Sequence, residues 1–436
     1  MKRTITPRYI AGLLLGLAVS TTAAGDDDLV IDIIGGVEGA TPIAIAPFAT
    51  QDGVSIESDP AAIIRSNLAR SGRFEVLPPD DLVAEPSRME DVRFSTWRAS
   101  GVDHLVVGAI SDGGDGRYEV RYELLDVFQG RRSDGRRYRV QEPHMRLLAH
   151  SISDRIFEEV TGREGAFNTR IAYVAVEDGA ENEGRTHRLV VADSDGHRAQ
   201  TILTSDEPLL SPAWSPSRDR LAYVSFEGRR SEIFVQDIGT GERERIASFR
   251  GINSAPAWSP DGDRLAVTLS RDGAANIYII DVDSGDVEPL TDHWAIDTEA
   301  AWAPDGESVY FTSDRGGRPQ IYRIPTEGGR AERVTYEGDY NARAALSPDG
   351  EYLAMVHRRD GDYHIALKDL ETESVQILSE GPADESPSFA PNGEMIIYTA
   401  GGVEGARLKT ASRVGGAVAP LESTEHEGTR VREPAW

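Results

Sequence analysis

The residues of this chain best suited to acid–base chemistry are carboxylates that share positions in a repeated pattern. They are Asp297, Glu299, Asp384 and Glu385, and each lies where a predicted strand begins. Two carboxylates about 5–10 Å apart can act as acid and base on a glycosidic bond. A secreted glycosidase or lactonase is therefore one hypothesis, and it requires a fold that brings these side chains to one centre.

Searches for other catalytic and metal-binding patterns exclude the common ones. Cysteine is absent, which rules out disulfides, thiol nucleophiles, thiolate zinc sites and iron–sulfur clusters. No G-x-S-x-G, H-E-x-x-H, P-loop or strand-bound G-x-G-x-x-G motif occurs. The nine histidines are scattered, and the nearest pairs, His144/His150 and His357/His364, lack the i, i+4 spacing of a helical metal site. We expect no metal or cofactor, although the frequent Asp-Gly turns would also suit Ca²⁺.

The charge balance limits the class of partner. The 436 residues include 46 basic and 73 acidic side chains, a formal charge of -27. Such a surface repels phosphate backbones and anionic lipid, so we expect no nucleic-acid partner.

The first 24 residues are typical of a secretory signal peptide. Lys2, Arg3 and Arg8 precede an apolar run from Ile10 to Val19, and small residues suited to cleavage follow at 22–24. The run is about ten residues long, well short of the ~20 needed to span a bilayer as a helix. We expect a cleaved signal and a mature protein that does not span a membrane.

A repeated phrase fills the second half of the chain. Its large apolar residue steps by 44, 44, 44 and 43 positions from Trp214 to Phe389, and a Pro-Asp-Gly or related turn follows each copy. Runs rich in β-branched and aromatic residues come next. Four strands in every ~40–50 residues are typical of a β-propeller blade.

The length of the repeat region sets the number of blades. Residues 170–436 hold six units of about 44 residues. The first unit lacks the phrase, whereas the chain ends on an orphan copy, Pro434–Trp436. We therefore predict that the C-terminal strand completes the first blade and closes the ring without a covalent link.

The residues before the repeat have mixed α and β character. A strand is expected at 42–48, a helix capped by Ser58 or Asp59, strands at 105–109 and 118–127, and a helix over 145–160. The sequence thus predicts an N-terminal α/β domain over residues 25–165 and an all-β six-bladed propeller over residues 166–436.

The connections that enter the inner strands should emerge together around the propeller channel. One of them carries Trp294 outside the repeated phrase, where an exposed aromatic side chain could anchor a partner. The tryptophans that belong to the repeated phrase recur at one blade position, which indicates packing between blades. A ring of apolar, acidic and amide side chains suits recognition of a protein or peptide.

Several phrases together resemble the TolB family of the Tol-Pal cell-envelope system. They are PIAIAPF at 42–48, GAFNTRIAYV at 165–174, SPAWSP at 211–216 and TSDRGGRPQ at 312–320. Propeller phrases occur in many unrelated proteins, but the linker motif joined to this N-terminal domain is specific. The likeness spans the whole mature chain.

This resemblance implies a noncatalytic periplasmic adaptor that acts in outer-membrane integrity and cell division. Its partners would be the Pal lipoprotein at the propeller mouth and the C-terminal domain of TolA at the N-terminal tail, with outer-membrane proteins as a further class. Family members also serve in bacteriocin import. The positions implied for Pal are Asn253, Ala255, Thr298 and Glu299, with Ile252 where family members can carry histidine.

The tail implied for TolA is residues 26–34. It contains Asp28 and the alternating apolar residues Leu29, Ile31 and Ile33. Such an alternation could add as a strand to the edge of a partner's sheet.

Overall fold

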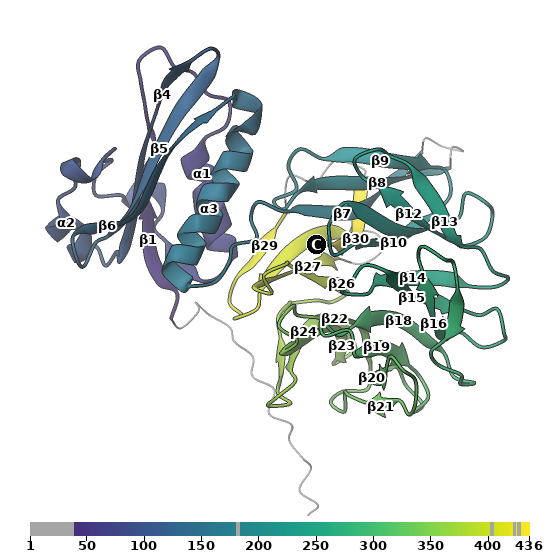
Figure 1. The fold of residues 1–436 in the computed structure, drawn as a ribbon. Coiled ribbons are helices and arrows are strands. Elements are labelled where there is room, and N and C mark those ends of the chain that lie inside the picture. The colour runs from purple at the N-terminus through teal and green to yellow at the C-terminus, as the bar shows by residue number, and fades with distance from the viewer. Residues whose placement is uncertain (1–38, 180–183, 402–404, 422–423, 425–428) are drawn as a thin grey trace, which may run out of the picture.

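The computed structural model describes residues 39–179, 184–401, 405–421, 424 and 429–436, which form two lobes (Figure 1). The predicted signal peptide and the tail with Asp28, Leu29, Ile31 and Ile33 lie outside these residues. In the part of the chain that is described, no helix has the length and apolar character needed to cross a membrane.

The smaller lobe is a mixed sheet with helices on both faces. Its strands lie in the order β3-β1-β4-β5-β6, with β2 beside β4; β1 runs parallel to β3 and β4, and β4 to β6 are antiparallel. Helices α1 and α3 pack on one face, and α2 lies on the other (Figure 1). The strands are β1 (Thr41–Ile45), β2 (Ala49–Thr50), β3 (Phe74–Val76), β4 (His104–Gly114), β5 (Arg117–Asp126) and β6 (Arg131–Val140). The helices are α1 (Pro60–Arg70), α2 (Phe94–Ala99) and α3 (Met145–Thr161), with short 3-10 turns at Pro79–Asp81, Met89–Asp91 and Glu142–His144.

Local signals explain where the two long helices begin and end. The Asp59 side chain accepts a hydrogen bond from the Ala61 N–H, and Pro60 occupies the first helical position, as predicted for α1. Helix α3 ends at Gly162, whose φ of 73° is left-handed and favours glycine. Strand β3, helix α2 and strand β6 were not predicted. In the case of β6 the reason is that the strand is rich in arginine and lacks an apolar alternation.

The larger lobe consists of six four-stranded antiparallel sheets arranged in a ring, which confirms the predicted propeller (Figure 1). Three blades, from inner to outer strand, are β10 (Leu209–Trp214), β11 (Arg220–Ser225), β12 (Glu232–Asp237), β13 (Arg243–Ala247); β14 (Asn253–Trp258), β15 (Arg264–Leu269), β16 (Asn276–Asp281), β17 (Val287–Pro289); and β18 (Asp297–Trp302), β19 (Ser308–Ser313), β20 (Gln320–Pro325), β21 (Glu332–Arg333).

The other three blades include the one that closes the ring. They are β22 (Asn341–Leu346), β23 (Tyr352–Arg359), β24 (Asp362–Asp369), β25 (Val375–Ile377); β26 (Glu385–Phe389), β27 (Met395–Ala400), β28 (Arg407–Ser412), β29 (Val418–Pro420); and β30 (Thr429–Ala435), β7 (Arg170–Asp178), β8 (Arg185–Asp193), β9 (Gln200–Ser205). C-terminal strand β30 pairs with β7, so the prediction that the last strand completes the first blade is confirmed.

Tryptophans of the repeated phrase bind neighbouring blades to each other. Trp258 donates from Nε1 to the Ala213 carbonyl, and Trp302 donates to the Ala257 carbonyl, both at 3.1 Å in the preceding blade. The predicted packing role of these residues is confirmed.

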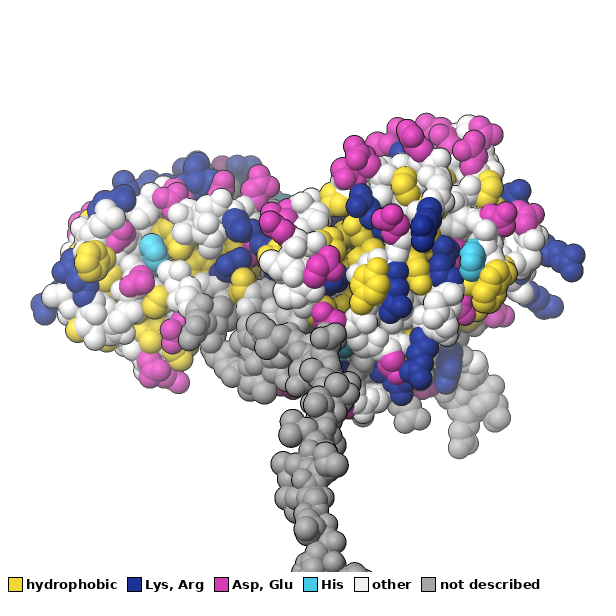
Figure 2. Space-filling model, turned by 90° about the horizontal axis from the view of Figure 1, so that it is seen from below, with side chains coloured by type: hydrophobic (Ala, Val, Ile, Leu, Met, Phe, Trp, Pro, Cys, Tyr) yellow, Lys and Arg dark blue, Asp and Glu magenta, His cyan; other side chains and the backbone are white. Residues whose placement is uncertain are grey.

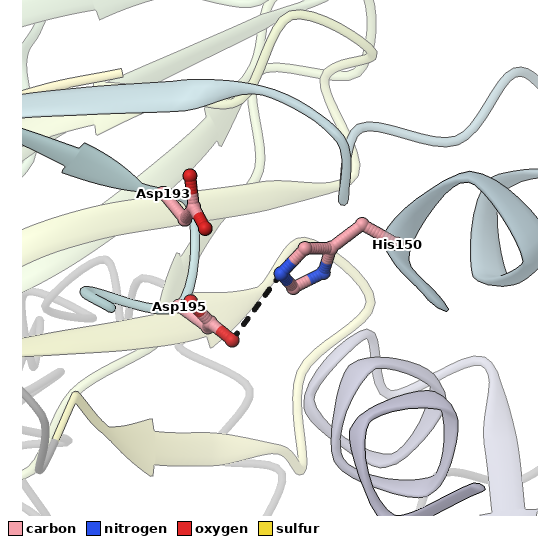
Figure 3. A group of neighbouring side chains, drawn as sticks. All are labelled: His150, Asp193 and Asp195. Atoms are coloured by element: carbon pink, nitrogen blue, oxygen red, sulfur yellow. Dashed lines mark ion pairs between the residues drawn. The ribbon is translucent and has the colours of Figure 1, made fainter. Parts of the chain in front are cut away.

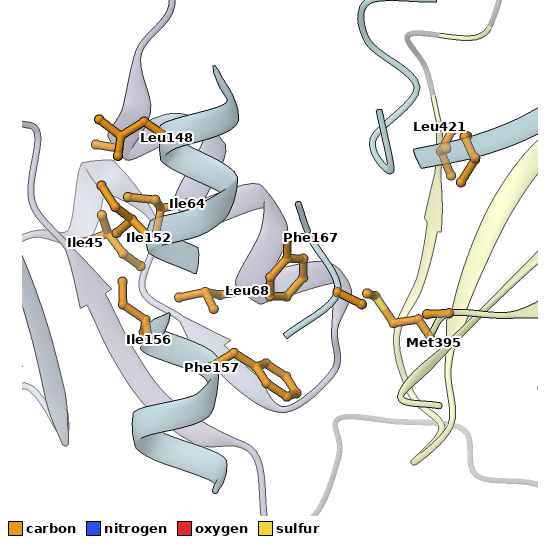
Figure 4. Packing of buried hydrophobic residues seen from close by; sticks show 14 of the residues in the cluster. Ile45, Ile64, Leu68, Leu148, Ile152, Ile156, Phe157, Phe167, Met395 and Leu421 are labelled. Atoms are coloured by element: carbon orange, nitrogen blue, oxygen red, sulfur yellow. The ribbon is translucent and has the colours of Figure 1, made fainter. Parts of the chain in front are cut away.

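The two lobes share one apolar cluster and a tight contact. Phe157 and Phe167 lie on the N-terminal side of this cluster, and Met395 and Leu421 come from the propeller (Figure 4). At the end of α1, Gly72 has a φ of +69°, and a Cβ there would lie 2.6 Å from the Ser412 side chain. Any larger residue at Gly72 would therefore push the lobes apart.

Candidate partner-binding face of the propeller

The propeller has two distinct ends because all six inner strands run in the same direction. The connections that precede the inner strands emerge at one end, which we call the loop face. The Pro-Asp-Gly turns that follow the inner strands lie at the other end, the turn face.

The first residue of several inner strands is a buried polar side chain that bonds to a neighbouring loop or turn at the loop face. Asn253 is fully buried and pairs with both the N–H and the carbonyl of Phe249 at 2.8 Å. Asp297, also fully buried, accepts from Ser313 at 2.6 Å and from Arg315 at 2.7 Å. These side chains fix the shape of the loop face and are not themselves available to a partner.

Exposed apolar side chains lie in three successive connections of the loop face. Ile252 is 47% exposed, Trp294 is 81% exposed, and Ile296 and Tyr336 are more than half exposed. Figure 2 shows that hydrophobic side chains on the propeller surface alternate with arginines and acidic residues. An apolar anchor with polar neighbours is typical of a protein-binding surface.

Hydrogen bonds made by Asn276 and His293 hold the loop that carries Trp294 in place. Asn276 accepts from the His293 N–H at 2.9 Å and donates to the His293 carbonyl at 3.3 Å. Ala295, next to the tryptophan, is buried, and its N–H donates to the His293 ring at 3.0 Å. Trp294 is therefore an exposed aromatic on an ordered loop, which lowers the entropy lost when a partner binds.

A ring of strained residues lines the channel halfway along the inner strands. Each inner strand has a β-bulge at the same place, with one non-glycine residue at a φ between 49° and 57°. These residues are Ser211, Ala255, Glu299, Arg343, Ser386 and Glu433. Backbone strain of this kind often occurs at functional sites, so the ring is a candidate for a role in binding.

Polar contacts across the ring narrow the channel. Arg343 donates from Nε to Glu299 at 2.8 Å and from Nη1 to the Ser386 hydroxyl, and Glu433 accepts from the Ser211 N–H. Burial lowers the pKa of Arg343, but nearby glutamates outweigh it and hold that pKa above its usual value. A cavity of about 460 Å³ lies between this ring and the turn face.

The structure places the predicted partner-binding residues of the propeller in three kinds of position. Ile252 and Trp294 are exposed in loops, whereas Asn253 and Thr298 lie in β14 and β18 rather than in loops, because the inner strands begin earlier than expected. Ala255 and Glu299 belong to the channel ring. Ile296, Tyr336 and Arg343 were not among the predicted partner-binding residues. Arg343 could have been found, since it stands 44 positions after Glu299 in the repeat.

Three of the four carboxylates of the enzyme hypothesis are held by other groups. Asp297 is paired with Arg315, and Glu299 with Arg343 and Thr312. Asp384 is buried and accepts from the Gly381 N–H at 2.9 Å; burial raises its pKa. These three carboxylates therefore serve as ion-pair partners and caps.

A histidine and two aspartates meet at the contact between the lobes. The ligand atoms of His150, Asp193 and Asp195 lie within 4.8 Å of one another (Figure 3). Asp193 accepts from Arg198 at 2.6 and 2.7 Å, and Asp195 accepts from Arg146. Because these arginines already neutralise both carboxylates, we interpret the group as an ion-pair cluster between the lobes.

The same cluster predicts a loss of stability in acid. Burial raises the pKa of Asp195, but a hydrogen bond from His150 and the charges of Arg146 and Arg70 lower it further, so the pKa lies below its usual value. A depressed carboxyl pKa stabilises the fold above the unfolded pKa of about 4, and this contribution disappears as the pH falls below it. We expect the free energy of unfolding of Asp195→Asn, measured by urea titration, to converge on that of the wild type in acid. A constant difference at every pH would contradict this.

Comparison with known proteins decides the family. The TolB beta propeller domain matches residues 157–436, and the TolB amino-terminal domain matches residues 29–133. The chain belongs to the TolB family. Its resemblance to TolB in sequence motifs is thereby confirmed, and the family places it in the Tol-Pal system.

Relatives of high identity cover almost the whole chain. "Tol-Pal system protein TolB" of Alkalilimnicola ehrlichii is 60% identical over 429 residues, which is 98% of each chain. The protein of the same name from Thioalkalivibrio sulfidiphilus is 57% identical over 433 residues, 99% of this chain and 98% of that one. The crystal structure of TolB from Acinetobacter baumannii matches with a TM-score of 0.81 and 40% identity, over 91% of this chain and 96% of that one.

Proposed function

We propose that this TolB-family protein is a noncatalytic periplasmic adaptor that binds Pal through the loop face and the C-terminal domain of TolA through residues 26–34. In this role it supports outer-membrane integrity and constriction of the envelope at cell division. The observation that carries the Pal assignment is Trp294, exposed on an ordered loop that also carries Ile296, with Ile252 exposed in the preceding connection of the loop face. The engaged state of Asp297, Glu299 and Asp384 supports a noncatalytic role.

Replacing Trp294 by alanine tests the Pal assignment. A central aromatic anchor typically contributes a few kcal/mol to binding, so we expect affinity for Pal to fall by about 10- to 100-fold in calorimetry. Because the side chain is almost fully exposed, the melting temperature should hardly change.

The chain offers a matched control for this experiment. Phe128 is 82% exposed but lies between β5 and β6 of the N-terminal domain, outside the propeller. Phe128→Ala should leave Pal affinity unchanged. If Trp294→Ala binds Pal as tightly as this control, the loop face is not the Pal site.

Deleting residues 26–34 from the mature protein tests the TolA assignment. We expect association with the TolA C-terminal domain to be lost while Pal affinity and thermal stability are retained, because the segment precedes β1 and is close to the N-terminus of the mature chain. A collapse in stability would instead mark the segment as a structural strand.

A further inference from the structure

The N-terminal sheet ends in a long strand whose outer edge is uncovered. Strand β6 pairs with β5 along its whole length, from Arg131 opposite Asp126 to Val140 opposite Tyr118. It is last in the strand order, and its other side pairs with no described strand. The unpaired N–H and C=O groups of such an edge are a template for an added strand.

Contacts on its inner face hold β6 in a fixed shape. The Tyr138 ring stacks on Tyr122, with centroids 6.4 Å apart. Asp134 accepts from the Tyr122 hydroxyl and from Arg155 of α3 at 3.3 Å. The edge is therefore ordered before any partner arrives, which reduces the entropy cost of pairing.

The edge is also strongly basic, although the net charge of the whole protein is negative. Between Arg131 and Val140 there are five arginines and one aspartate, whereas the whole chain has a formal charge of -27. Figure 2 shows basic side chains along the upper and left margins of the N-terminal domain. Only part of this charge is paired: Arg132 contacts Glu123 at 3.2 Å, and Arg137 contacts Glu119 at 3.4 Å.

Two arginines of β6 indicate that this edge could bind an anion from outside the protein. Arg136 and Arg139 are exposed, and neither has an ion-pair partner among the residues that the structure describes. Phe128, in the turn before β6, adds an exposed apolar contact at one end of the strand. An acidic, extended segment with alternating apolar residues would match the open backbone, the charge and the aromatic side chain together.

We propose that β6 is a docking edge for an acidic, extended peptide segment of another protein, which adds as a further strand and pairs its carboxylates with Arg137 and Arg139. These two side chains lie on one face of the sheet, while Arg136 on the other face adds to the positive charge of the edge. This site is on the opposite domain from the loop face and does not depend on the function proposed above. Edge arginines can also serve only to prevent aggregation, and in that case no acidic strand would bind.

The test is binding of a fluorescent peptide of alternating aspartate and valine, matched to β6 in length, to the mature full-length protein. We expect saturable binding, measured by anisotropy, that weakens steeply from about 0.1 M to about 1 M salt as the Debye length falls. The variant R136Q/R137Q/R139Q should bind about tenfold more weakly, and R229Q/R250Q/R330Q, which removes three exposed propeller arginines, should bind normally. Hydrogen exchange should slow at β6 amides when the peptide is bound.

Other outcomes would overturn the proposal. They are equal loss of binding in both triple variants, equal binding of a lysine–valine peptide, and binding without protection of β6. Binding of anionic vesicles with the same dependence on Arg136, Arg137 and Arg139 would assign the edge to a lipid surface instead. Peptide binding only after deletion of residues 26–34 would show that the chain's own acidic tail is the occupant.

Discussion

Replacing Glu394 by alanine is expected to destabilise the protein by about 3–5 kcal/mol, because it removes a buried carboxylate that pairs with three arginines, one of which, Arg413, is itself buried. The Glu394 side chain is 1% exposed and accepts from three arginines: Arg73 at 2.7 Å, Arg163 at 2.8 Å and Arg413 at 2.9 Å. The first two belong to the N-terminal domain and its linker, and the third to the propeller. One carboxylate thus joins the two lobes.

The repeat supplies matched controls for this prediction. Glu307 and Glu351 occupy the same position in the two preceding turns. Glu307 lies 44 residues before Glu351, which lies 43 residues before Glu394, and both are exposed. Their alanine variants should change the free energy of unfolding, measured in urea, by no more than about 0.5 kcal/mol. Proteolysis of the linker at 162–169 should speed up only in Glu394→Ala. Equal stability of all three variants would show that the cluster does not hold the lobes together.

Replacing Trp436 by alanine is expected to cost a similar amount, about 3–5 kcal/mol, by opening a cavity where the ring closes. Trp436 is 6% exposed and donates from Nε1 to Thr169 at 2.8 Å, while its main-chain N–H donates to Ser388 at 3.0 Å. It therefore links the closing strand β30 to the linker and to the neighbouring blade. Deleting residues 429–436 should remove cooperative unfolding altogether, because β7 would lose its inner partner.

Trp294→Ala is the matched control for Trp436→Ala, since it deletes the same side chain from an exposed site. Its melting temperature in calorimetry should stay close to that of the wild type, whereas that of Trp436→Ala should fall by several degrees, as expected for a loss of this size. A Trp436 variant as stable as the Trp294 variant would mean that the ring does not depend on its C-terminal closure.

Regular spacing allowed much of the fold to be predicted. Phrases 43 or 44 residues apart, each ending in a tight turn, can bury their apolar residues only by stacking as blades, so the six blades and the closure by Pro434–Trp436 followed from the sequence. Capping and periodicity likewise indicated α1 and α3. Strand β6 escaped prediction because its arginines carry no apolar alternation, and only pairing with β5 makes it a strand.

The candidate sites depend more on tertiary structure than the fold does. The repeat showed that Asn253 and Asp297 are equivalent, but only the structure shows that both are buried clamps while Trp294 and Ile296 are exposed. The bulge that turns Glu299 and Arg343 into the channel leaves no mark in the residue types at those positions.

Glu394 illustrates the difference between what can be predicted from the sequence and what only the structure shows. The sequence by itself determined the repeating blades, the turn that carries each acidic residue, and the closure of the ring, because these depend on local propensity and on period. It could not distinguish Glu394 from Glu307 and Glu351, because each of the three directly follows a Pro-Asp-Gly or Pro-Asn-Gly turn. Only the docking of the N-terminal domain on one blade surrounds Glu394 with arginines, since burial and charge pairing arise between segments that are distant in sequence.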